Sequence, residues 1–263
     1  LISAVINMLT PYNSIHNSSI AKFVVIVLAY FITAKFGLMV PYKDSVATMM
    51  WLPTGIAVGA IMRWGNISLP AIYLAVVMVE YSAGLSILTS LAIAITNTAG
   101  PYLTAYLLKI SRFNHSLLKQ KDIGLMIGAA LIGMLISATG GVFTLYYSGL
   151  VSDDMAIVWF VWWLGDAVGV LLALPLALNI YKQKLHINAH QIYQLLTWLA
   201  VFVLCESVIT VYMTGLNKQF MLSIFLILPI LIWASMNFGI VGGSLVVIIL
   251  SAIAVWATSQ GFG

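Results

Sequence analysis

Residues 156–181, AIVWFVWWLGDAVGVLLALPLALNIY, contain a single charged side chain, Asp166. As a helix, this stretch extends about 39 Å at 1.5 Å per residue. The hydrocarbon core of a bilayer is only about 30 Å thick, and about 20 apolar residues span it. The stretch therefore predicts a transmembrane helix that holds Asp166 within the membrane.

The whole chain shares this apolar character. Hydrophobic residues make up 62% of it, charged residues only 7%, and the mean hydropathy is +1.08. Soluble domains have about 45–50% apolar and roughly 25% charged residues. Backbone polar groups in lipid must bond within their own segment, and the alternating pattern of barrel strands is not seen. The composition therefore predicts an all-α bundle in contact with the lipid bilayer.

Clusters of polar residues, Gly and Pro divide the chain into about nine predicted spans, and a tenth is expected in the complete domain. Two of these spans, the second and third, are short and could form one re-entrant pair. We interpret residues 1–19 as a cytoplasmic or interfacial segment and 20–263 as one polytopic transmembrane domain. The spans lie near residues 20–40, 46–63, 67–84, 86–108, 122–147, 156–181, 191–213, 219–237 and 239–258.

The basic residues predict an orientation, because Lys and Arg are enriched in cytoplasmic loops. With the N-terminus in the cytoplasm of a bacterial cell, eight of them lie inside, and the acidic loop Asp153-Asp154 faces outward. The chain is then a multi-pass protein of the inner membrane. Nine spans would leave Gly263 outside, so we expect a further span and a cytoplasmic output region. The basic residues sit in short gaps rather than on one stripe, which argues against nucleic-acid binding. The eight inner residues are Lys22, Arg63, Lys109, Arg112, Lys119, Lys121, Lys182 and Lys184.

Several polar side chains are predicted to lie in the outer half of the membrane, where ionisable groups are costly and commonly functional. With the aromatic residues near them, they predict a polar cavity that opens toward the periplasm. Pro53 frees a backbone carbonyl there. The alternative for each carboxylate is an inert packing contact. Trp residues are more often interface anchors than ligand walls, and Lys35 can extend to the headgroups. The predicted ligand-binding or signal-sensing residues are Trp51, Pro53, Thr54, Gly55, Glu80, Asn97, Trp162, Trp163, Asp166 and Glu206.

No enzyme motif is found. Phosphate-binding, serine-hydrolase and Cys-x-x-Cys patterns are absent from the sequence, and we predict no catalytic residue, cofactor or metal site. His186 and His190 have the i,i+4 spacing of metal ligands, but no Cys or acid is near them in sequence. Four Gly-x3-Gly patterns permit close helix approach and are interpreted as internal packing. They begin at Gly55, Gly124, Gly165 and Gly239.

The segments around Trp51 and around Asp166, together with two further stretches, resemble the first type of the bacterial membrane-associated sensor family, the MASE domain. The similar segments cover most of the chain in the family's order. They are Trp51-Leu52-Pro53-Thr54-Gly55-Ile56-Ala57 with Arg63, Gly65 and Pro70; Asn97-Thr98; Trp162-Trp163-Leu164-Gly165-Asp166-Ala167-Val168-Gly169-Val170-Leu171 with Pro175; and Ile232-Trp233-Ala234-Ser235 with Phe238-Gly239.

The resemblance implies a sensory membrane domain that precedes histidine kinase, PAS or diguanylate cyclase modules. This chain departs from the family at three positions: Glu80 replaces a frequent Asn, Gly100 a frequent Glu, and Asn237 an Arg. These departures suggest that an acid has moved from one wall of the cavity to another.

We therefore predict a sensory input domain that receives a small-molecule or membrane-protein signal and passes it to a cytoplasmic output domain. A homodimer is compatible with the sequence. Two other functions stay open. One is a transporter or substrate-binding subunit with an outward-open cavity, and uptake by proteoliposomes would reveal it. The other is a membrane anchor that recruits a partner protein.

Overall fold

The computed structural model describes residues 18–39, 48–151, 155–181, 188–212 and 216–259, without the side chains of 202–203, 205–227 and 257–259. The expected N-terminal segment 1–19 therefore lies almost wholly outside the described residues. All regular elements in the described part are helices, which confirms the predicted all-α class. The chain divides into two compact units, Leu1–Ala177 and Leu178–Gly263, which are described separately.

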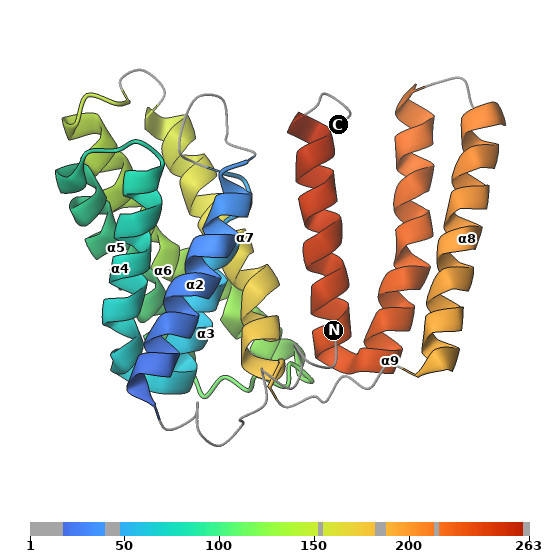
Figure 1. The fold of residues 1–263 in the computed structure, drawn as a ribbon, viewed down its shortest axis with the longest axis horizontal. Helices are drawn as coiled ribbons and strands as arrows, with labels where there is room; N and C mark the ends of the chain where they lie inside the picture. The colour runs from blue at the N-terminus through green and yellow to red at the C-terminus, as the bar shows by residue number, and fades with distance from the viewer. Residues whose placement is uncertain (1–17, 40–47, 152–154, 182–187, 213–215, 260–263) are drawn as a thin grey trace. The chain divides into compact units, whose positions relative to one another are not determined.

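The helices of the first unit run side by side (Figure 1). Helix α5 packs against α4 and α6, and α2 packs against α3 and α4. Helix α3 also packs against α5, so α5 has neighbours on several sides. The elements are α2 (Ser19–Gly37), α3 (Leu52–Trp64), the 3-10 helix η1 (Gly65–Ser68), α4 (Leu69–Ser82), α5 (Ile87–Ile110), α6 (Gln120–Tyr147) and α7 (Met155–Asn179).

Five helical stretches in the described part of the chain are long and apolar enough to cross a membrane. This confirms a multi-pass membrane protein, while the expected count of about nine spans is not confirmed. Helices do occupy all nine expected positions. Of these, α3 and α4 have only 13 and 14 residues, and they count as one stretch with η1. The five stretches are Ser19–Gly37, Leu52–Ser82, Gln120–Tyr147, Met155–Asn179 and Leu228–Trp256.

Helix α3 begins later than the span predicted over residues 46–63. It starts at Leu52, and Pro53 lies in its first turn. Proline suits this position, because the N–H groups of the first turn have no partner within the helix. Pro53 therefore starts a helix instead of interrupting one, and residues 48–51 before it are non-helical.

Helix α5 ends in a C-terminal capping turn. Phe113 N–H bonds to the Leu108 carbonyl and Arg112 N–H to that of Lys109, at 3.0 and 3.2 Å. These two bonds form a Schellman motif, whose central residue takes a left-handed backbone conformation. Arg112 takes it here, with a φ of 54°. The motif folds Phe113 back beside Leu108 and fixes where the chain leaves the helix.

The second unit contains α8 (Ala189–Tyr212) and α9 (Leu216–Ser259). The chain reverses direction at Gly239, where φ is 55°, so that α9 forms two arms (Figure 1). This turn lies at the boundary predicted between the eighth and ninth spans. The Trp233 indole donates to the Gln194 side-chain oxygen at 2.9 Å and joins the first arm to α8.

Candidate functional site

Asp166 lies at the centre of a buried polar cluster in the first unit. Its carboxylate accepts hydrogen bonds from the hydroxyls of Thr54 on α3, at 2.7 Å, and Ser137 on α6, at 2.5 Å. The Trp162 indole, one turn earlier on α7, is a third hydrogen-bonding neighbour. Asp166 and Ser137 are each 1% exposed and Thr54 is 3% exposed. The carboxylate is thus shielded from solvent and held by three side chains from three helices.

The hydrogen bonds continue from Ser137 to a fourth helix. The Ser137 hydroxyl lies 2.7 Å from the side-chain oxygen of Asn97 on α5. A serine hydroxyl has one proton to donate, so it cannot donate to Asp166 and Asn97 at once. Either Ser137 donates to Asp166 and accepts a hydrogen bond from the Asn97 amide, or Ser137 donates to Asn97 and accepts a hydrogen bond from a protonated Asp166 carboxyl. The cluster can therefore adopt two hydrogen-bonding patterns without moving a helix.

Aromatic and acidic side chains border the cluster. Tyr30, on α2, is 1% exposed and lies close to the Trp51 indole. Tyr30 lies close enough to both Asp166 and Glu80 to interact with them electrostatically. Glu80 is 5% exposed and sits near the end of α4. Two carboxylates and a tyrosine from three helices thus share one buried region.

Residues 48–51, the Trp51 segment, pack directly on the backbone of α7 near Asp166, because glycines on α7 leave room for them. Trp51 N–H donates to the Gly165 carbonyl at 3.1 Å. A Cβ on Gly169 would overlap the Trp51 carbonyl oxygen, and one on Gly165 would overlap that of Thr48. Non-helical backbone at membrane depth is tolerated only where it is buried in protein or lines water. Residues 48–51 meet this condition by packing on α7.

Helices α3 and α7 approach closely through facing small residues. A Cβ on Gly55 would meet the Gly169 carbonyl, and one on Gly59 would lie 2.7 Å from the Cβ of Ala177. This confirms that the Gly-x3-Gly patterns at Gly55 and Gly165 serve internal packing. At Gly124 and Gly128, an added Cβ would meet no atom of the described residues within 4 Å.

A model of the MASE1 family matches residues 23–263, which is most of the chain. The chain belongs to the MASE1 family. MASE1 domains are membrane sensor domains that supply sensory input and carry no catalytic activity. No curated protein and no solved structure matches the chain. The two segments that best carry the resemblance, around Trp51 and around Asp166, are the two that pack together in the structure.

In this MASE1 domain, the paired tryptophans of α7 have different surroundings. Trp162 is buried, and its ring would lie 2.8 Å from a Cβ on Gly141, so a glycine on α6 makes room for it. Trp163 is half-buried and donates its indole N–H to the Leu131 carbonyl on α6 at 2.8 Å. It also stacks on Trp159, whose indole reaches Thr139. Trp162 therefore touches the Asp166 cluster, while Trp163 fastens α7 to α6.

Two other candidates lie elsewhere. Glu206 is on α8 in the second unit, and its side chain lies outside the described residues. Lys35 directs its ammonium to the Ser82 carbonyl at 3.5 Å and lies over the Phe31 ring.

Of the spaced histidines, His186 lies outside the described part. No group of three or more metal-ligating side chains occurs among the described residues.

Two residues in or next to the Asp166 cluster, Ser137 and Tyr30, were not predicted from the sequence. Ser137 is a small neutral residue beside Ala138 and Thr139, and such residues are common where membrane helices pack. Tyr30 offered a signal, since it stands in the middle of an apolar run and not at an interface, where tyrosine is enriched. A tyrosine at mid-span indicates a buried polar partner.

Proposed function

We propose that this chain is the input domain of a bacterial signalling protein, and that the Asp166 cluster is where its two signalling states differ. In this proposal the domain lies in the inner membrane with its N-terminus in the cytoplasm. A small molecule or membrane partner acts from the periplasmic side. A cytoplasmic kinase or cyclase module receives the signal.

The observation that carries the proposal is the link between four helices through one buried carboxylate. Thr54, Ser137 and Asn97 lie on α3, α6 and α5, and all connect to Asp166 on α7. A hydrogen bond between membrane helices contributes about 0.6 kcal/mol on average and up to about 1.7 kcal/mol. Two conformations that are both populated differ by only a few kcal/mol. The free energy of exchanging hydrogen-bond partners at Asp166 is therefore large enough to change the relative populations of two helix packings.

The surroundings of the cluster support an input from one side of the membrane. Trp51 and Glu80 lie near the same end of the unit as Lys35, which contacts the end of α4 at Ser82. The Thr98 hydroxyl, next to Asn97, is buried in the described chain without a hydrogen-bond partner. Buried polar groups normally have a hydrogen-bond partner, so the Thr98 hydroxyl is a position on α5 where a bound polar molecule gains a hydrogen bond. A signal shifts the balance only if it binds the two packings with different affinity.

The test compares two Thr→Val substitutions in the natural full-length protein. Thr54→Val removes a bond between helices, whereas Thr144→Val removes only a bond within α6, to Gly140. We expect Thr54→Val to change the basal phosphorylation or cyclic-dinucleotide synthesis in membranes about threefold, which corresponds to about 0.6 kcal/mol. Thr144→Val should match the wild type at equal protein amount. Wild-type output from both Thr54→Val and Asp166→Asn would contradict the proposal.

A further inference from the structure

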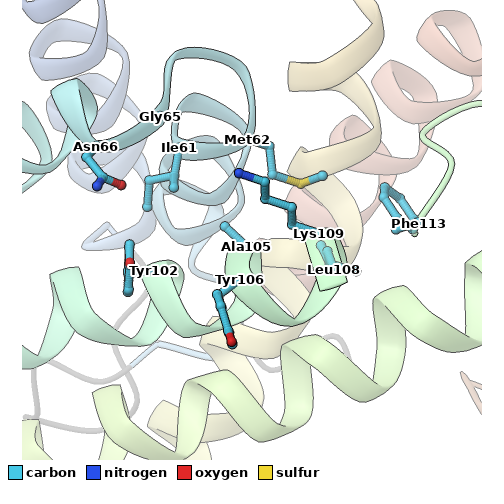
Figure 2. A pocket seen from close by; sticks show the side chains of 10 residues that line it. All are labelled: Ile61, Met62, Gly65, Asn66, Tyr102, Ala105, Tyr106, Leu108, Lys109 and Phe113. Carbon is cyan, nitrogen blue, oxygen red and sulfur yellow. The ribbon is translucent and has the colours of Figure 1, made fainter. Parts of the chain in front are cut away.

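A cavity of about 380 Å³ lies at the other end of the first unit from the Trp51 segment. Its walls come from the end of α3, from η1 and from the second half of α5, and Phe113 adds a wall beyond α5 (Figure 2). The Schellman turn at Arg112 sets the position of Phe113, so this wall is part of the fold. The cavity is thus built by three elements and is separate from the Asp166 cluster.

The cavity lining combines one positively charged side chain with several apolar ones. Lys109 supplies the charge, Asn66 an amide, and Tyr102 and Tyr106 hydroxyl groups. Figure 2 shows the Lys109 amine turned toward Ile61 and Met62 on α3. None of the lining residues is acidic. The nearest acid in sequence, Asp122, already accepts the Asn114 N–H at 3.0 Å. The lining therefore favours an anionic group with apolar material attached.

The position on the helix points to a lipid. Tyr102, Tyr106 and Lys109 have the i, i+4, i+7 spacing that places residues on one helix face. The two tyrosines are 42% and 52% exposed, so this face opens toward the membrane. Arg63, Arg112, Lys119 and Lys121 cluster at the same end of α3, α5 and α6, and such clusters mark the cytoplasmic surface. Anionic lipids are concentrated in that leaflet, and each nearby Lys or Arg adds about 1 kcal/mol to their attraction.

We propose that this cavity binds the phosphate headgroup of an anionic phospholipid of the cytoplasmic leaflet. Lys109 neutralises the phosphate, since lysine is a common phosphate ligand. The Asn66 amide donates a hydrogen bond to a headgroup oxygen. The acyl chains lie along the exposed side of α5, while Ile61 and Met62 cover the glycerol backbone.

The test uses the full chain purified in a neutral detergent, with lipid binding measured by native mass spectrometry. We expect phosphatidylglycerol to bind in preference to phosphatidylcholine. Lys109→Gln should weaken phosphatidylglycerol binding about fivefold, the equivalent of about 1 kcal/mol. Lys109→Arg should retain it. The matched control is Lys35→Gln, which removes a charge at the other end of the unit and should bind like the wild type.

Three results would overturn the proposal. The first is equal binding of the two lipids by the wild type. The second is wild-type phosphatidylglycerol binding by Lys109→Gln. The third is binding of soluble glycerol 3-phosphate as tight as that of the lipid, because it would assign the cavity to a free phosphate. Lys109 is exposed, so its replacement leaves the folded core intact, and size-exclusion profiles verify this.

Discussion

Gly169→Ala is expected to destabilise the domain by about 1–3 kcal/mol, the usual cost of inserting atoms into a packed core. The added Cβ overlaps the Trp51 carbonyl oxygen, which is backbone and cannot rotate away. The Trp51 segment must then move off α7, and the Trp51–Gly165 hydrogen bond and the Thr54–Asp166 contact are lost with it. Thermal denaturation in detergent, followed by loss of the monodisperse peak, measures the effect.

Gly124→Ala is the matched control for this prediction. Both glycines lie in helices and in Gly-x3-Gly patterns, but a Cβ on Gly124 meets nothing within 4 Å. Alanine is the better helix former by about 1 kcal/mol, so Gly124→Ala should be neutral or slightly stabilising. Equal melting temperatures for the two variants would show that the Trp51 backbone does not approach α7 as closely as described.

Asp166→Leu is expected to cost about 1–3 kcal/mol, although leucine is similar in size and suits a membrane interior. It leaves the Thr54 hydroxyl buried without its acceptor, and an unsatisfied buried group costs about 1–3 kcal/mol, whereas Ser137 can still donate to Asn97. Asp166→Asn should cost much less, because its amide oxygen still accepts the Thr54 hydrogen bond. Titration with a denaturing detergent, followed by tryptophan fluorescence, separates the two variants.

The stabilities of Asp166→Leu and Asp166→Asn also show whether Asp166 acts by filling space or by hydrogen bonding. If Asp166 only filled space, leucine would be tolerated and the amide would be the more harmful change. An Asp166→Leu protein as stable as the wild type would show that the Thr54 hydroxyl finds another partner, and that the cluster does not hold the helices together.

The sequence was sufficient to predict that Thr54, Asn97 and Asp166 belong together. Each is polar, each lies within an apolar run, and all three were predicted to lie in the outer half of the membrane. The glycines at 55 and 165 also indicated a close approach. A buried carboxylate needs hydrogen-bond donors at its own depth; Thr54 is such a donor, while Asn97 is linked to Asp166 only through Ser137.

Other features could not be predicted from the sequence. Ser137 joins the cluster only because the crossing of α5 and α6, through Gly100 and Gly133, turns it toward Asn97, and helix crossings are not encoded locally. The start of α3 was placed too early because residues 48–51 are apolar but take their backbone conformation from α7. The cavity at Lys109 was missed since it forms only when α3, η1 and α5 meet.

The hydrogen bond between Thr54 and Asp166 is the centre of the proposed mechanism, and a double-mutant cycle tests it most directly. The free energy of unfolding is measured for the wild type, Thr54→Val, Asp166→Ala and the double variant. A direct bond predicts a coupling energy of about 0.6–1.7 kcal/mol between the two positions. Effects that add to within about 0.3 kcal/mol would contradict the bond, and with it the role of Asp166 as the link between these helices.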